Sequence, residues 1–165
     1  MVFRDGVGDG RLNHTLEYEV PQIQQAFKRF GDGYNPKLSF VVVSKRVLSR
    51  FAIANTRVNS VVPFTKYEST LLRTLVIQGE YDNVPVGTVV DHTINKVYAD
   101  GWPNFYLVSQ STLRGTVSPT HYILLYDNSD IHPDHLQKLT YKLTFMYVNS
   151  PAGSISVPAP CMVSF

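Results

Sequence analysis

The sequence predicts an α/β fold in which helices cover both faces of a central sheet. Residues 1–4 have the pattern of a strand and are followed by an amphipathic helical pattern over 11–30. Near the other end, the strand-like residues 121–126 are followed by a second helical pattern. Strands that alternate with helices at both ends of a chain imply a three-layer architecture. The 165 residues, 44% of them apolar, suffice for one domain with a buried core.

The first strand ends at a carboxylate. Asp5 follows residues 1–4, and Gly6, Gly8 and Gly10 after it predict a tight turn. The carboxyl end of a strand is a favoured place for a functional residue in α/β sheets. An aspartate that caps the turn before glycine is the alternative. The glycines do not predict a phosphate loop, because the Walker lysine and the dinucleotide spacing are absent.

The first helix is expected over 11–30, where apolar residues recur at steps of three and four: Leu12, Leu16, Val20, Ile23, Phe27 and Phe30. Pro21 lies inside this pattern. Because an interior proline costs a helix ~3 kcal/mol, we expect a kink or a break there.

The next segment, 38–43, is a short run of β-branched apolar residues, typical of a strand covered on both faces. Further strands are predicted at 89–90, 105–108 and 121–126. Pro133 and Asp134 suit the first turn of the last helix. Its apolar stripe is expected to consist of Leu136, Leu139, Leu143 and Met146.

Composition excludes several classes of protein. No apolar run approaches the ~20 residues that cross a bilayer, and the N-terminus lacks the apolar region of a signal peptide. We therefore expect a cytoplasmic or nuclear protein without membrane contact. Cys161 is the single cysteine, which excludes an internal disulfide and a cysteine-rich metal site.

The basic charge is concentrated in one part of the chain. Between residues 28 and 73 there are nine lysines and arginines but only two acidic residues, Asp32 and Glu68. Such asymmetry is expected of a phosphate-binding face. An ordinary solvated surface is the alternative that the residues alone leave open.

Several motifs follow one another in a recognisable order: FRDGVGDG (3–10), FYLVSQ (105–110), GTVSPTHY (115–122), LTYKL (139–143) and VPAPC (157–161). In this order they resemble the C-terminal half of the PIWI domain of Argonaute-family proteins, closest to the Piwi subfamily. The resemblance covers residues 1–165 and implies a partial RNase H-like (PIWI) fold, with a central mixed sheet flanked by helices.

The resemblance implies a catalytic role for one residue and leaves the rest of the site incomplete. The family cleaves RNA with two aspartates, a glutamate and usually a histidine that hold two Mg²⁺ or Mn²⁺ ions. Asp5 matches the second aspartate. The first aspartate and the glutamate precede this segment in the family, and Phe165 stands at the histidine position. One carboxylate is too few for such a site, so we expect this chain alone neither to hold metal stably nor to cleave RNA.

Residues 45–50 resemble the family segment Lys-Arg-x-x-x-Arg, whose two arginines contact the backbone of the guide strand. The corresponding residues are Lys45, Arg46 and Arg50. The guanidinium fork suits this role because it binds phosphate oxygens in pairs. Surface arginines beside a strand are the alternative. Tyr147 and Ser156 fall near other family positions that approach the guide's phosphates.

Three histidines are interpreted without catalytic roles. His121 is a family marker and is expected to be a structural residue of the core. His132 and His135 have the HxxH spacing, but no third ligand is nearby in sequence, which argues against a zinc site.

Two stretches depart from the family pattern. An atypical insertion lies at about 57–84, and Asn104 replaces the aspartate of an aromatic-Asp-Phe motif. Because a structureless loop of that length is uncommon in a compact domain, a short helix or strand packed on the surface is expected within it, formed by Leu71, Leu72, Leu75 and Val76. A retained intron or an error in the gene prediction is the alternative.

Together these features predict a small-RNA-guided gene-silencing module, of the piRNA type, that binds the guide RNA backbone. The expected partners are a small guide RNA, a complementary target RNA and the remainder of a Piwi protein, or another protein, that covers an open sheet edge. A fragment of an active Piwi slicer endoribonuclease, or a truncated paralogue that acts through protein contacts, remains as an alternative.

Overall fold

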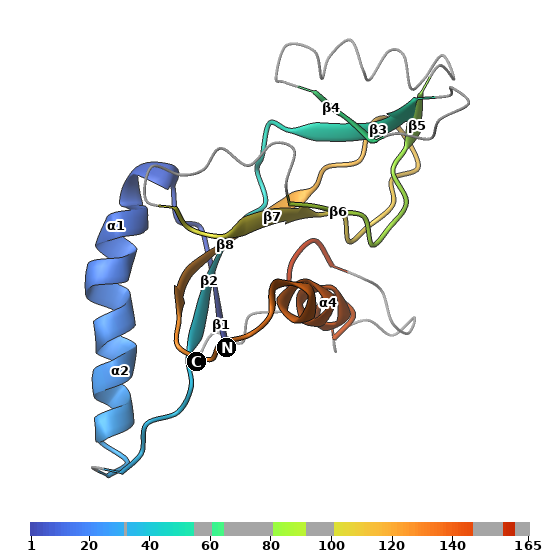
Figure 1. Cartoon of the computed structure of the whole chain (residues 1–165). Coiled ribbons are helices and arrows are strands. Elements are labelled where there is room, and N and C mark those ends of the chain that lie inside the picture. The colour runs from blue at the N-terminus through green and yellow to red at the C-terminus, as the bar shows by residue number, and fades with distance from the viewer. Residues whose placement is uncertain (32, 55–60, 65–80, 92–100, 147–156, 161–165) are drawn as a thin grey trace.

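The computed structural model describes residues 1–31, 33–54, 61–64, 81–91, 101–146 and 157–160. Its main sheet has five strands in the order β1 (Val2–Asp5), β2 (Ser39–Ser44), β8 (Thr120–Asp127), β7 (Asn104–Leu107) and β6 (Val89–Val90). β1 and β2 are parallel, and all other neighbours are antiparallel. The prediction of a central mixed sheet is confirmed (Figure 1).

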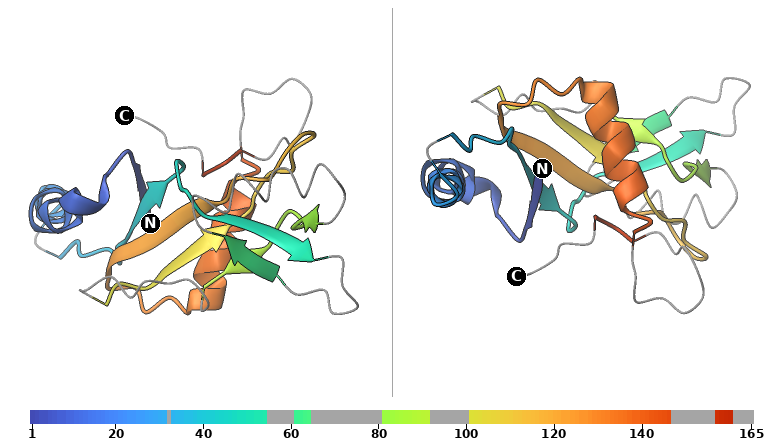
Figure 2. Two further views of the ribbon diagram at one scale, coloured as in Figure 1. Left: turned by 90° about the horizontal axis from the view of Figure 1, so that it is seen from above. Right: turned by 90° about the horizontal axis from the view of Figure 1, so that it is seen from below.

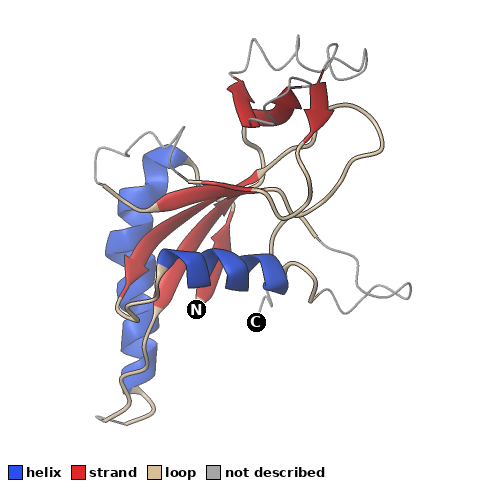
Figure 3. Ribbon diagram, turned by 45° about the vertical axis from the view of Figure 1, so that its right-hand side comes forward, coloured by secondary structure: helices blue, strands red, loops and turns tan. Residues whose placement is uncertain are grey.

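Helices cover both faces of this sheet. Three consecutive elements, α1 (Leu12–His14), the π-helical turn η2 (Thr15–Glu19) and α2 (Val20–Lys28), form one long helix on one face, preceded by the short η1 (Asp9–Arg11). The final helix α4 (Pro133–Leu143) lies on the opposite face (Figures 1 and 3).

The alternation of β2 explains why both faces of its central residues are buried. Phe40 and Val42 join the core beneath the long helix, together with Leu12 and Val20. Val41 and Val43 join the other core, where Leu136 of α4 packs. Since successive side chains of a strand point to opposite faces, a strand between two helical layers needs apolar residues on both of its sides, as residues 40–43 provide. The expectation for 38–43 is confirmed.

Of the kink or break expected at Pro21, the break is wrong, because the helix continues through the proline, but the helix is irregular in the turn just before it. The N–H of Val20 bonds to the carbonyl of Thr15, five residues earlier, so the turn before the proline is wider than an α-helical turn. Pro21 then stands at the start of α2, where a missing N–H is tolerated. The expected stripe is also too long, because α2 ends at Lys28 and Phe30 is 78% exposed.

Helix α4 begins as predicted, with Pro133 in its first turn and His132 as its N-cap, whose Nδ1 accepts from the N–H of Asp134 at 3.3 Å. The expected apolar stripe is partly wrong. Leu136 is buried, but Leu139 is 38% and Met146 63% exposed. The buried residues on this side of the chain are Leu136, Thr140 and Thr144, which are spaced by four, so two threonines take the place of the expected leucines.

A second, three-stranded sheet has the order β4 (Val61–Phe64), β3 (Arg50–Ala54) and β5 (Tyr81–Asn83), all antiparallel. Figure 1 shows it beyond the β6–β7 edge of the main sheet, and Figure 2 shows the same arrangement from above and below. Phe51 and Val84 pack there with Val108 and Val117. Within the insertion at 57–84, β4 and β5 are strands. Residues 57–60 and 65–80, which include the short helix or strand expected at 71–76, lie outside the described part.

None of the helices in the described ranges combines the length and the apolar character needed to span a bilayer. Cys161 lies outside the described residues.

Candidate nucleic-acid interface

Asp5 and Lys45 meet because β1 and β2 run parallel and end at the same edge. Asp5 is in register with Val43, and Lys45 follows two residues later. The Lys45 Nζ lies 2.7 Å from the Asp5 Oδ2, with the two side chains 46% and 34% exposed. Gly6, at φ +81°, then turns the chain away in a conformation that an L side chain rarely adopts.

Arg4 fixes the other side of this strand end. Its Nε donates to Glu19 Oε2 at 2.8 Å and its Nη2 to Glu19 Oε1 at 3.1 Å. Its Nη1 donates to the backbone carbonyl of Asp5 at 2.6 Å. The hydrogen bonds that Arg4 donates to Glu19 raise the pKa of Arg4 above its usual value. Sequence reasoning missed this pair, because nothing in the helical pattern shows that the π-helical turn brings Glu19 to β1.

Arg46 is an exposed cation of the segment without a partner among the described residues. It follows Lys45 on the connection between the two sheets, and in the described part of the chain no hydrogen bond or ion pair holds its guanidinium. Its fork is therefore available to an anion in solution.

Arg50 has a different position. It is half-buried at the start of β3, and its Nη1 donates to the backbone carbonyls of Val47 and Ser49, both at 2.7 Å. The guanidinium thereby closes the connection formed by residues 45–49, which we call the basic loop. Arg50 sets the shape of this loop, a role that the alternative of a plain surface arginine does not include.

The described residues do not by themselves fit a two-metal site. No three histidine, cysteine, aspartate or glutamate residues come together within the described ranges. Asp5, the one carboxylate expected to bind metal, already has an ammonium group on its Oδ2.

His121 is a buried, neutral residue beneath this edge. It pairs with Ser44 across β2 and β8, is 5% exposed, and stacks on Tyr106 with ring centroids 4.2 Å apart. Its Nε2 lies 3.0 Å from Asn104 Oδ1, while Asn104 Nδ2 donates to the carbonyl of Trp102 at 3.1 Å. With its nitrogen donating to that carbonyl, the Asn104 amide presents its oxygen to Nε2 of His121.

Burial lowers the pKa of His121 from 6.5 to about 4, and the charge of Asp9 opposes this only in part. The expectation of a structural histidine in the core is confirmed by its burial.

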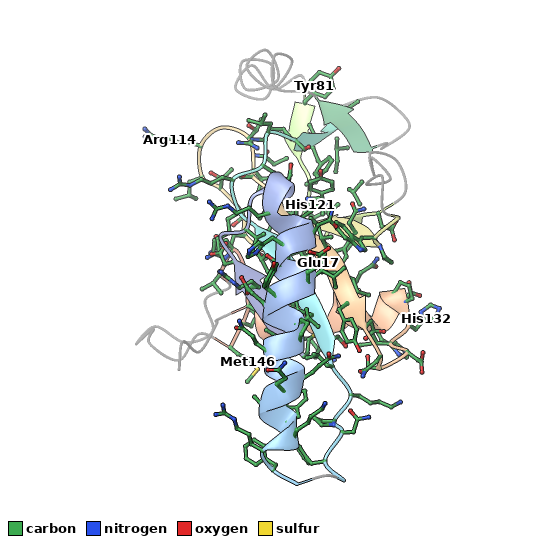
Figure 4. All side chains as sticks on the ribbon, turned by 90° about the vertical axis from the view of Figure 1, so that its left-hand side faces the viewer. Glu17, Tyr81, Arg114, His121, His132 and Met146 are labelled. Atoms are coloured by element: carbon green, nitrogen blue, oxygen red, sulfur yellow. The ribbon has the colours of Figure 1, made fainter. Side chains whose placement is uncertain are left out.

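The remaining candidate site residues fall into two groups, those outside the described part of the chain and two histidines at the start of α4. Tyr147, Ser156 and Phe165 lie outside the described residues. His132 and His135 lie on the exposed start of α4, with ring centroids 5.9 Å apart. His132 and Arg114 both lie at the periphery of the molecule (Figure 4).

Comparison with known proteins agrees with this arrangement. The Piwi domain profile matches residues 1–164. "Piwi-like protein 1" of Danio rerio is 45% identical over 161 residues, which are 98% of this chain and 16% of that protein. "Piwi-like protein Ago3" of Bombyx mori is 43% identical over 98% of this chain and 15% of its own length. The chain thus spans about one sixth of the length of these relatives.

Solved structures show the same fold. The crystal structure of Drosophila Piwi matches with a TM-score of 0.65 and 31% identity, over 96% of this chain and 18% of that chain. The structure of Kluyveromyces polysporus Argonaute with a guide RNA matches with a TM-score of 0.69 and 27% identity, over 96% of this chain and 17% of that chain. The mixed sheet with its flanking helices is the RNase H-like fold of these proteins. This chain belongs to the Piwi domain family.

Proposed function

We propose that this chain is the RNA-backbone-binding part of a small-RNA-guided silencing protein, and that the basic loop contacts the guide strand. Membership of the Piwi domain family supports the class of function. The solved Argonaute relative is described as bound to a guide RNA. Since the similar relatives are Piwi-like proteins, the guide we propose is a piRNA-type RNA, bound in the cytoplasm or the nucleus.

The observation that carries this proposal is that the two arginines of the segment have different environments. Arg46 presents an exposed guanidinium, while Arg50 holds the loop's carbonyls. A preorganised loop binds more tightly than a flexible one because less ordering entropy is lost. Arg46 therefore makes the phosphate contact, and Arg50 keeps it in position.

The remainder of a Piwi-type protein is the partner we propose for β1. This strand is the outer strand of the described five-stranded sheet and pairs only with β2 there. Its free backbone groups are a template for another strand. Slicer activity would need further metal-binding carboxylates from such a partner, with Asp5 as one ligand and Mg²⁺ or Mn²⁺ as the metal. Tyr147 and Ser156 remain proposed phosphate contacts, and a complementary target RNA remains the proposed second strand.

Filter binding with 5′-phosphorylated single-stranded RNA tests the proposal. Arg46→Ala should weaken binding and reduce the slope of log affinity against log salt by about 0.7, the contribution of one phosphate in a single strand. Arg29→Ala is the matched control, because Arg29 is exposed and lies at the C-terminal end of α2.

Equal affinities of Arg46→Ala and the unmodified chain would refute the role of the basic loop. Thermal unfolding of all three proteins should show that each is folded, since substitution of an exposed residue changes stability by less than about 0.5 kcal/mol.

A further inference from the structure

We propose that Asn83 is a positioning residue for a second RNA contact: it fixes the loop of residues 109–116, so that Arg114 meets the RNA backbone in addition to the basic loop. The inference rests on the proposed function and adds to it a second cation and the side chain that holds that cation in place.

Asn83 joins the second sheet to the 109–116 loop through both ends of its side-chain amide. Its Nδ2 donates to the backbone carbonyl of Gly115 at 2.8 Å, and its Oδ1 accepts from the backbone N–H of Val117 at 2.9 Å. One partner is an acceptor and the other a donor, so the position needs a side chain that does both. Aspartate there would lose the first bond, and alanine would lose both.

The Asn83 amide is held by rigid surroundings. Asn83 lies in β5 in register with Ala52 of β3, which is fully buried. The next residue, Val84, is 4% exposed and packs into the core of the second sheet. The backbone of Asn83 is therefore fixed on both sides, and its two hydrogen bonds transfer this rigidity to the loop.

Both cation-bearing loops start from this same small core. The 109–116 loop lies between Val108 and Val117, which pack in one cluster with Phe51. Arg50, which closes the basic loop, directly precedes Phe51 in the sequence. Because a phosphate backbone presents charge at every nucleotide, one strand can contact cations on two loops that share a base.

The tip of the 109–116 loop presents a preformed cation. Leu113 and Arg114 are both exposed, and Figure 4 shows Arg114 at the periphery of the molecule. Thr112 Oγ1 donates to the carbonyl of Arg114 at 2.9 Å, and Gly115 turns the chain at φ +76°. Among the described residues, no hydrogen bond or ion pair holds the Arg114 guanidinium. A guanidinium on a braced loop binds phosphate with little loss of entropy.

The salt dependence of RNA binding tests both roles, with the same 5′-phosphorylated single-stranded RNA. Arg114→Ala should reduce the slope of log affinity against log salt by about 0.7, the contribution of one phosphate. Asn83→Ala removes no charge, yet it should reduce the slope by a similar amount, because the unbraced loop no longer holds Arg114 on the strand. A purely structural Asn83 would lower stability and leave the slope unchanged.

A double variant and two single variants complete the test. Asn83→Ala combined with Arg114→Ala should bind like Arg114→Ala alone, since the positioned cation is already absent. Lys138→Ala removes an exposed lysine of α4 and should leave the slope unchanged. Thr112→Ala lies in the exposed part of the loop, away from the core, and should weaken binding even if Asn83→Ala does not fold.

An unchanged slope in Arg114→Ala, or in folded Asn83→Ala, would overturn the inference, and the first result would assign the loop to a partner other than RNA. Arg46→Ala separates this outcome from failure of the proposed function. A reduced slope in Arg114→Ala together with no effect of Arg46→Ala would support the second contact and refute the role of the basic loop.

Discussion

At the scale of single residues, a hydrogen bond between two neutral side chains holds His121 in the core. His121 and Asn104 form a buried neutral pair, with the amide oriented by the carbonyl of Trp102. The resemblance to the family implies an aspartate at the position of Asn104. With asparagine there, protonation of His121 gains no opposite charge from this partner, and burial keeps the ring neutral.

This pair predicts acid sensitivity. The pKa of His121 is about 4 in the fold and near its ordinary 6.5 once unfolded, so between these values the unfolded chain binds more protons. The contribution of the neutral His121 ring to the free energy of unfolding is therefore fully present above pH 6.5. This contribution decreases as the pH drops towards 4, by about 3 kcal/mol for this residue alone. Urea unfolding at a series of pH values measures the effect.

Asn104→Asp is the control for this prediction. A carboxylate 3.0 Å from the His121 Nε2 position would favour the protonated ring and raise its pKa. The loss of stability between pH 6.5 and 4 should then be smaller than in the unmodified chain. An unchanged pH profile in this variant would show that other groups cause the acid sensitivity.

At the scale of elements, the basic loop depends on one side chain from the strand that follows it. Arg50→Ala removes both hydrogen bonds to the carbonyls of Val47 and Ser49. Hydrogen bonds from a charged donor contribute ~1.5–3 kcal/mol each at most, and less when half-exposed. We expect a loss of about 1–3 kcal/mol in chemical denaturation, together with weaker RNA binding.

Arg46→Ala provides the comparison, because it should weaken RNA binding without this loss of stability. If both variants unfold at the same denaturant concentration as the unmodified chain, Arg50 does not hold the basic loop.

A helix or strand could be predicted from the sequence where its own residues determine it, and not where contacts with other parts of the fold do. Residues 38–43 and 121–126 could be recognised as strands because most of their side chains are apolar and pack into the cores on the two faces of the sheet. The π-helical turn could not, because it depends on the local accommodation of Pro21. The exposure of Leu139 on α4 could not be predicted either, since helical spacing does not show which side of the apolar stripe packs against the sheet.

The candidate site shows the same limit. The resemblance named four site residues, Asp5, Lys45, Arg46 and Arg50, but it assigned the same RNA-binding role to the three cations. Their separate partners, a carboxylate for Lys45 and backbone carbonyls for Arg50, arise from the register of β1 with β2 and from the path of the loop. Such pairings between distant residues are not visible in a single sequence.

At the scale of the whole molecule, the main sheet has an open edge. β1 pairs only with β2 within the described part and lies at the outside of the sheet. Unpaired strand edges promote association with other strands. We expect the 165-residue chain alone to self-associate in a concentration-dependent way, which light scattering after size-exclusion chromatography measures. A monomer at all concentrations would mean that another part of the chain protects this edge.

The way in which Arg50 closes the basic loop also bears on how this protein can change over time. Its guanidinium grips main-chain oxygens, which every amino acid possesses. The side chains of Val47, Leu48 and Ser49 contribute nothing to these two bonds, and Leu48 is 60% exposed, so substitutions there should leave the closure of the loop unchanged. A residue without a guanidinium at position 50 would remove it.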